Sequence, residues 1–140
     1  MILIKVVTNE DDYKKALEIR RKVFVEEQGV PLSEEQDEYD STATHYLAYL
    51  DGKVCGTCRV RNTPKGQKIE RNCVLPEFRN KGIGKKLISH VIEQLDPKYP
   101  IYLHAQIGVQ FFYETLNFVA QGEIFYEANI PHVLMFLQRK

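Results

Sequence analysis

The stretch that decides the fold is I-E-R-N-C-V-L-P-E-F-R-N-K-G-I-G-K-K-L, residues 69–87. Its first part, residues 69–75, is rich in residues that favour β-strands, and the strand cannot continue past Pro76, which has no amide hydrogen. Gly82 and Gly84 then precede apolar residues at helical spacing, namely Leu87, Ile88, Val91, Ile92 and Leu95. The stretch therefore predicts a strand, a short basic turn and the start of a helix.

The predicted helix start gathers positive charge. A helix N-terminus leaves about four backbone N–H groups without partners and carries roughly half a positive charge. Four cations nevertheless lie beside it, Arg79, Lys81, Lys85 and Lys86, and a bound phosphate would resolve that conflict. The pattern differs from nucleoside-triphosphate loops and from dinucleotide loops, which have a third glycine where Leu87 stands. We expect a pyrophosphate of another kind, and a plain turn with solvated lysines is the alternative.

Residues 79–84, R-N-K-G-I-G, resemble the R/Q-x-x-G-x-G/A signature of the GNAT acyltransferases. Residues 70–74 resemble the fourth strand of that family, and residues 112–118 resemble its F-Y-x-x-x-G-F segment. Asn117 replaces the family glycine there, and asparagine is the next-best residue for a left-handed helix end. Two further pieces, residues 20–28 and 130–133, resemble the small bacterial ElaA-like and YjcF-like branch.

The resemblance implies a fold, a cofactor and a set of binding residues. The expected fold is α/β (α+β), a mixed, mostly antiparallel sheet flanked by helices, with residues 1–140 as one N-acetyltransferase domain. Acetyl-CoA is the implied cosubstrate, with an amine as acceptor and no metal. The cofactor-binding residues implied by the match are Cys73, Val74 and Leu75 on the strand and Arg79, Asn80, Lys81, Gly82, Ile83, Gly84 and Lys85 in the loop.

Acyl transfer from a thioester to an amine needs a neutral amine, hydrogen-bond donors for the carbonyl oxygen and a proton for the departing thiolate. Tyr113 is the candidate general acid, and a core tyrosine is the alternative. Glu70, expected on the same strand face as Asn72 and Val74, is one candidate base. His132 is another, because histidine titrates in the useful range. Further histidine candidates are His45 and His104.

Cys73 is conceivable as an acyl-carrying nucleophile. No histidine lies at a recognisable spacing to activate it, so we expect direct attack of the amine in a ternary complex. Two functions follow as alternatives. One is an acetyl-CoA-dependent N-acetyltransferase acting on a primary amine of a small molecule or peptide. The other is a CoA-binding regulatory or sensor module without turnover.

The composition limits the partners. The 140 residues carry 19 basic and 19 acidic side chains, so no global field favours nucleic acid or an anionic membrane. No apolar run approaches the roughly 20 residues that span a bilayer, and the N-terminus lacks a signal-peptide pattern. A cytoplasmic protein is expected. The oligomeric state stays open, with a homodimer as one option.

The three cysteines do not predict a disulfide framework, because their number is odd. Cys55 and Cys58 are spaced as C-x-x-C, but they lie in a predicted strand after an Asp51-Gly52 hairpin turn. An odd separation on a strand directs the two sulfurs to opposite faces. We therefore expect reduced, partly buried thiols rather than a redox or metal site.

Two features of the N-terminal half carry alternatives. Arg20 interrupts the apolar stripe of a helix that begins near Asn9, so it either reaches solvent or meets a buried carboxylate. Residues 33–40 carry five acids. They predict either a solvated loop or short helix, or an acidic wall that attracts a cationic amine.

Overall fold

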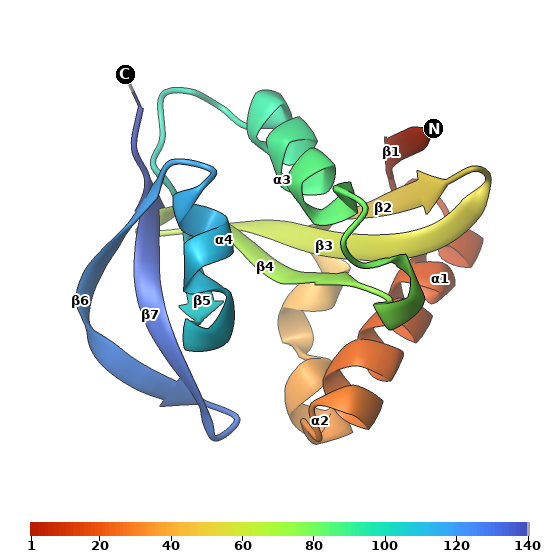
Figure 1. The fold of residues 1–140 in the computed structure, drawn as a ribbon, viewed down its shortest axis with the longest axis horizontal. Coiled ribbons are helices and arrows are strands. Elements are labelled where there is room, and N and C mark those ends of the chain that lie inside the picture. Colours follow the sequence, from red (N-terminus) through yellow and green to blue (C-terminus); the bar gives the residue numbers. More distant parts are fainter. Residues whose placement is uncertain (140) are drawn as a thin grey trace.

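The computed structural model describes residues 1–139, which fold around a seven-stranded sheet (Figure 1). Its strands are β1 (Ile2–Val6), β2 (Thr44–Leu50), β3 (Lys53–Thr63), β4 (Gly66–Val74), β5 (Ile101–Gln106), β6 (Phe118–Glu127) and β7 (Ile130–Leu137). The helical segments are α1 (Glu10–Arg20), the π-helical η1 (Arg21–Glu27), α2 (Leu32–Glu35), η2 (Glu38–Ser41), η3 (Pro76–Phe78), α3 (Ile83–Gln94), η4 (Ile107–Val109) and α4 (Gln110–Glu114). The predicted mixed α/β class is confirmed.

Strand order in the sheet is β1-β2-β3-β4-β5-β7-β6. Every neighbouring pair is antiparallel except β4 and β5. The β2–β3 hairpin turns at Asp51 and Gly52, whose φ angles of 50° and 86° suit a tight two-residue turn. At the start of α1, the Asn9 side chain accepts a hydrogen bond from the backbone N–H of Asp12, which caps the helix where the sequence predicts that it begins.

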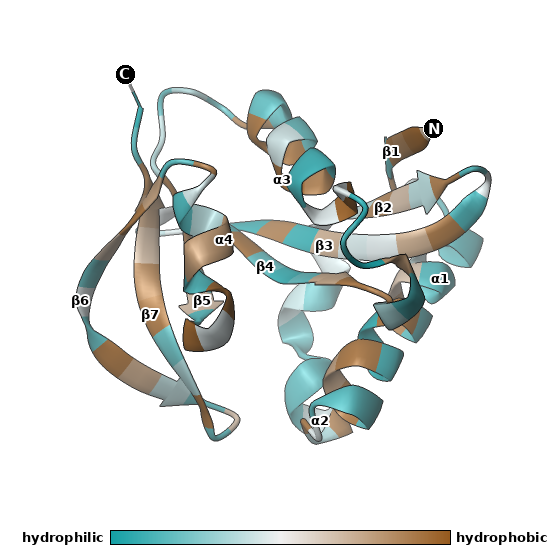
Figure 2. Ribbon diagram, viewed as in Figure 1, coloured by the Kyte–Doolittle hydropathy of each residue, from teal (hydrophilic) through white to brown (hydrophobic). Residues whose placement is uncertain are grey.

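Helices cover both faces of the N-terminal half of the sheet. α3 buries Leu87, Ile88 and Val91 on one face, and α1 buries Ala16 and Ile19 on the other. Figure 1 shows α3 and α1 on opposite sides of β3 and β4. Figure 2 shows hydrophobic and hydrophilic segments alternating along both helices, as one-sided burial requires.

The sheet opens between its two halves. β4 and β5 pair at only three positions, from Gln67 with Ile101 to Ile69 with Leu103, and then diverge (Figure 1). Beyond Ile69, the edge of β4 that would face β5 has no strand partner within the described chain. This divergence places an unpaired strand edge in the middle of the sheet.

A β-bulge in β4 corrects one sequence-based placement. The register of β3 with β4 shifts because β4 carries one extra residue there, and Arg71 adopts a left-handed φ of 56°. Glu70 therefore bonds Arg59 on the α1 side, whereas Val74 packs into the core beneath α3. The prediction that Glu70 shares a strand face with Asn72 and Val74 is wrong, because it assumed an unbroken period of two.

A second bulge decides the placement of the cysteines. β3 carries one extra residue opposite β2, between Val54 and Gly56. Cys55 and Cys58 consequently lie in one core cluster beneath α3, as buried free thiols. The expectation of opposite faces is wrong for the same reason as in β4, and both thiols are fully rather than partly buried.

Among residues 1–139, no helix is long and apolar enough to cross a membrane.

Candidate functional site

A cavity of about 1050 Å³ lies where β4 and β5 diverge. Its walls come from η1 and α2 on one side, and from β5, α4 and the β6–β7 turn on the other. The predicted site residues that line it are Glu70, Cys73, Val74, Arg79, Asn80, Gly82, Ile83, Gly84, Lys85, Tyr113 and His132. Leu75 and Lys81 are adjacent in sequence but do not belong to the lining. The fold thus brings together most residues that the sequence singled out.

The N-terminus of α3 opens at the rim of this cavity. Gly82 is the N-cap with φ 79°, a left-handed conformation that glycine adopts without steric cost. The first intrahelical bond runs from the Lys86 N–H to the Gly82 carbonyl, so the N–H groups of Ile83, Gly84 and Lys85 have no helical acceptor. In the described chain neither a side-chain cap nor an acidic residue occupies this first turn. The arrangement leaves a site for an anion.

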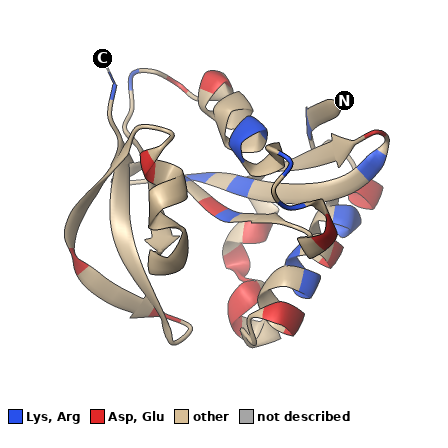
Figure 3. Cartoon of the chain, viewed as in Figure 1, with Lys and Arg blue, Asp and Glu red and all other residues tan. Residues whose placement is uncertain are grey.

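The cations around this turn have different roles. Arg79 donates to both carboxylate oxygens of Glu27 at 2.7 Å and to the Val74 carbonyl at 2.9 Å, so its charge is already paired. Lys81, Lys85 and Lys86 are exposed and form no ion pair within residues 1–139. Figure 3 shows basic residues in the turn and at the start of α3. Three lysines, rather than four cations, are therefore available to an anion.

Tyr113 projects from α4 and is 7% exposed. Its hydroxyl oxygen accepts a hydrogen bond from the Asn72 side-chain amide at 2.9 Å, so the hydroxyl proton stays free for another acceptor. Burial raises the pKa of Tyr113 to about 12, although the Asn72 bond opposes that shift. The phenol is therefore protonated at neutral pH. Asn72 was not a sequence-based candidate, since nothing in its spacing connects it to residue 113.

Glu70 lies among cations. Arg59 and Arg61 donate to its Oε1 at 3.1 and 2.8 Å, and the Lys68 ammonium lies 2.8 Å from its Oε2. Burial would raise the pKa of Glu70, but the Lys68 bond and the guanidinium charges outweigh it and lower this pKa to about 2. A carboxylate this weakly basic is a poor acceptor for an amine proton. The geometry therefore disfavours Glu70 as the general base.

His132 is held by its neighbours on the opposite wall. Its Nδ1 lies 2.7 Å from the Ile130 carbonyl, which can only accept, so Nδ1 carries the proton and Nε2 is the basic nitrogen. Nε2 lies 3.7 Å from the Glu127 carboxylate, whose other oxygen lies 3.0 Å from Nδ1 of His104. The ring of Phe125 stacks on His132. Both histidines and Glu127 line the cavity.

His45 lies elsewhere. Its Nε2 lies 2.9 Å from the Asp40 carbonyl, and burial is the main cause that lowers its pKa. It does not line the cavity, so it is the histidine candidate that the structure separates from the others.

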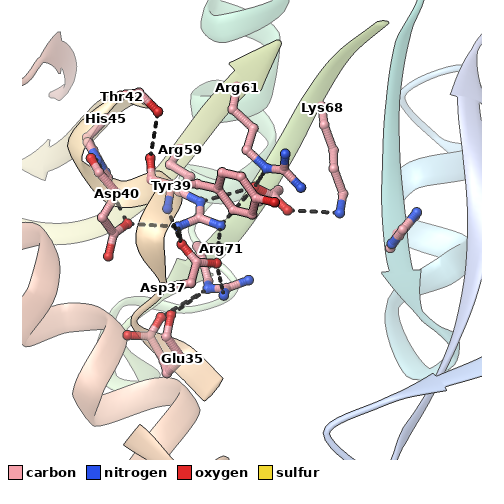
Figure 4. Close-up of polar contacts among 12 residues, drawn as sticks. Glu35, Asp37, Tyr39, Asp40, Thr42, His45, Arg59, Arg61, Lys68 and Arg71 are labelled. Carbon is pink, nitrogen blue, oxygen red and sulfur yellow. Dashed lines mark hydrogen bonds and ion pairs between the residues drawn. The ribbon is translucent and has the colours of Figure 1, made fainter. Parts of the chain in front are cut away.

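A buried ion-pair network lies behind the β4 wall, and Figure 4 shows its polar contacts. Arg20 bonds Glu35 and Asp40, each at 2.8 Å, which settles its two alternatives in favour of a buried carboxylate. Asp37 accepts two hydrogen bonds from Arg59, at 2.7 and 2.8 Å, and this hydrogen bonding is the main cause that lowers the pKa of Asp37 to about 2. Residues 32–35 and 38–41 form short helices, as one of the two alternatives predicts. Glu35, Asp37 and Asp40 are paired with arginines, so these three acids are neither freely solvated nor an unpaired acidic wall.

The sequence profile of the acetyltransferase (GNAT) domain matches residues 9–139. This chain belongs to the GNAT family. A relative from Bacillus subtilis (strain 168), whose name assigns it provisionally to the acetyltransferases, is 40% identical over 96% of this chain and 95% of its own length. The uncharacterized N-acetyltransferase YjcF of the same organism is 34% identical over 93% of this chain and 95% of its own length.

Solved structures agree with this GNAT assignment. The crystal structure of Escherichia coli ElaA superimposes with a TM-score of 0.87 at 25% identity, covering 99% of this chain and 100% of that one. A GNAT acetyltransferase from Elizabethkingia anophelis, solved with acetyl-CoA bound, shares the fold with a TM-score of 0.69 at 18% identity over 99% of this chain and 98% of that one. The predicted likeness to ElaA and YjcF is confirmed, and the chain is an N-acetyltransferase.

Proposed function

We propose that this protein transfers an acetyl group from acetyl-CoA to a primary amine by direct attack in a ternary complex. One observation carries the proposal above the others. The uncapped N-terminus of α3, with its left-handed Gly82, opens onto the same cavity as the protonated Tyr113 hydroxyl. The helix start suits a diphosphate, and the tyrosine hydroxyl suits a departing thiolate.

The cofactor would be bound mostly by backbone groups. In this proposal the N–H groups of Ile83, Gly84 and Lys85 bind the diphosphate, and the side chains of Lys81 and Lys85 add positive charge beside it. Asn80 and Arg79 shape the turn. The pantetheine arm lies along the unpaired edge of β4 beside Cys73, Val74 and Leu75, where an extended ligand adds as a strand would.

Gly84 places the start of α3 close to α4. A Cβ atom at Gly84 would lie 3.4 Å from the tip of the Phe112 ring, an ordinary van der Waals distance. The start of α3 and the helix that carries Tyr113 therefore lie close together at this cavity, as a ligand that contacts both requires.

The reaction needs a base for the amine and a donor for the sulfur. We assign the base to Nε2 of His132, which takes one amine proton as nitrogen attacks the thioester carbon. The carbon–sulfur bond then breaks, and the Tyr113 hydroxyl donates a hydrogen bond to the thiolate that leaves. Glu127 stabilises the imidazolium that forms beside it, through the 3.7 Å pair.

Direct attack is favoured over an acyl-enzyme at Cys73. That thiol is 7% exposed, and burial raises its pKa well above the usual value. The thiolate, not the thiol, is the nucleophile. A buried thiol with a raised pKa therefore makes a poor acyl carrier.

The experiment that tests the proposal measures thiol release from acetyl-CoA in the presence of a pool of primary amines. We expect release that depends on the amine pool, together with saturable binding of CoA by calorimetry. If CoA raises the melting temperature and no thiol is released with any amine, the CoA-binding module without turnover is correct instead. If CoA does not bind, both functions are wrong.

A further inference from the structure

Three cations surround the single carboxylate of Glu70, and two of them face the cavity. Arg61 donates to Glu70 through its Nε only. Its guanidinium carbon lies 3.9 Å from the centre of the Tyr39 ring, and this contact fixes the plane of the guanidinium group. Its two terminal nitrogens have no hydrogen-bond partner within residues 1–139. In the described part of the chain the Lys68 ammonium forms an ion pair with Glu70 alone. Both side chains line the cavity with unused donors.

The network behind these two residues does not cancel their charge. It contains five cations and four anions and therefore has a formal charge of +1: Arg20, Arg59, Arg61, Lys68 and Arg71 against Glu35, Asp37, Asp40 and Glu70. The side chains of Arg61 and Lys68 are only 21% and 11% exposed. Holding surplus positive charge away from water is costly unless an anion joins it.

The opposite wall carries a negative charge. Among residues 1–139, the Glu127 carboxylate pairs with two histidines, His104 at 3.0 Å and His132 at 3.7 Å, and its side chain is 46% exposed. Lys68 is close enough to stabilise the Glu127 carboxylate electrostatically. The cavity therefore presents donors on β3 and β4 and an acceptor with two imidazoles on β5, β6 and β7.

We propose that the acceptor is a small zwitterion, with a primary amine a few bonds from an anionic carboxylate or phosphate. Arg61 and Lys68 bind the anionic group, and Glu127 binds the ammonium beside Nε2 of His132. The ammonium loses one proton to solvent before attack and a second to Nε2 as nitrogen attacks. In this arrangement Glu70 is a positioning residue that holds the two cations toward the cavity. The inference rests on the proposed function and adds the acceptor class to it.

The first test compares matched acceptors with the wild-type protein. One arm uses a pool of amino acids against the pool of their carboxamides, and the other uses O-phosphoethanolamine against ethanolamine. We expect kcat/KM to be about 10- to 100-fold higher for the anionic member of at least one pair, the range for a charge-assisted contact. The amine of the carboxamide is less basic, so a larger fraction of it is neutral and able to attack near pH 7, which works against the expected preference. The arm that shows it identifies the anion.

Equal or better turnover of the uncharged members in both arms overturns the inference while the proposed function stands. Absence of thiol release with every amine, with CoA still bound, overturns both. The outcomes therefore separate a wrong acceptor class from a wrong enzyme.

Variants then test the assigned residues. Arg61→Gln and Lys68→Gln should each raise KM for the preferred acceptor about tenfold or more, with KM for acetyl-CoA and the rate with the uncharged partner compound nearly unchanged. Arg21→Gln is the matched control, because Arg21 pairs with Glu18 and Glu26 on the exposed side of the helix. An equal loss with charged and uncharged acceptors in both cavity variants would contradict the assignment.

Discussion

Replacing Tyr113 by phenylalanine removes one hydroxyl and keeps the ring. The ring packs edge-on against Phe112 and Phe118, with centroids 5.1 and 5.8 Å away, and those contacts survive the change. The Asn72 amide loses its acceptor, which should cost about 1–2 kcal/mol of stability. The variant therefore isolates the hydroxyl from the packing.

The size of the effect follows from the pKa of this phenol. A leaving thiol with an ordinary pKa of about 8.5 is about 3.5 units more acidic than Tyr113, whose pKa is about 12. Complete proton transfer would be uphill by about 5 kcal/mol, so the hydroxyl acts by hydrogen bonding to the developing thiolate. Such a bond contributes about 1.5–3 kcal/mol, so Tyr113→Phe should lower kcat about 10- to 150-fold.

The assay is thiol release under saturating acetyl-CoA and acceptor, with a thermal melt to show that the variant is folded. KM for acetyl-CoA should change less than about twofold, because the lost bond forms only as the sulfur gains charge. A near-normal kcat would remove Tyr113 from the mechanism. A loss above about ten-thousand-fold would show that full proton transfer is required and that the hydrogen-bond account is wrong.

Three further predictions concern stability. Arg59→Met leaves the carboxylates of Asp37, Asp40 and Glu70 short of a shared partner and should lower the free energy of unfolding in urea by about 3–5 kcal/mol; a loss below about 1 kcal/mol would contradict the network's role. Gly82→Ala should lower stability by about 1–2 kcal/mol, because the left-handed φ of Gly82 strains alanine, although no atom lies within 4 Å of an added Cβ. Gly82→Asn should cost less. Equal melting temperatures for the wild type and Gly82→Ala would refute the strain. The lowered pKa of Glu70 stabilises the fold fully above its ordinary value of 4.5, and this stability, about 3 kcal/mol, is lost as pH falls toward about 2. Glu70→Gln should therefore make the free energy of unfolding depend less on pH in this range. An unchanged pH dependence would contradict the role of Glu70.

Much of the fold could be predicted because its signals are local. The Asn9 cap, the Asp51-Gly52 turn and the glycines around α3 each define a boundary by backbone chemistry alone. The turn before α3 could also be located from the sequence, since its glycines precede a helical pattern, and its four cations, which conflict with the helix dipole, are the basis of the proposed diphosphate site. The element that sequence reasoning placed least well was β4, where Arg71 forms a bulge.

The rest depends on contacts between distant residues. One extra residue in a strand moves every later side chain to the opposite face of the sheet. The residues around Arg71 give no sequence signal for this bulge. The ion-pair network is hard to predict for a related reason: the sequence offers Arg20 a buried carboxylate as one alternative, but it does not show that Arg59 shares the same acids. A signal did exist: basic residues in a central, buried strand require acids from elsewhere, and residues 33–40 supply them.

A comparison of CoA with pantetheine, which lacks the diphosphate, tests the central claim most directly. Backbone amide shifts and binding heat are measured for both ligands with the wild-type protein and with a Lys81→Gln, Lys85→Gln double variant. We expect CoA, and not pantetheine, to shift the amides of Gly82, Ile83, Gly84 and Lys85, and the double variant to bind CoA more weakly. Equal shifts with both ligands, or no heat with CoA, would show that the start of α3 does not bind a diphosphate.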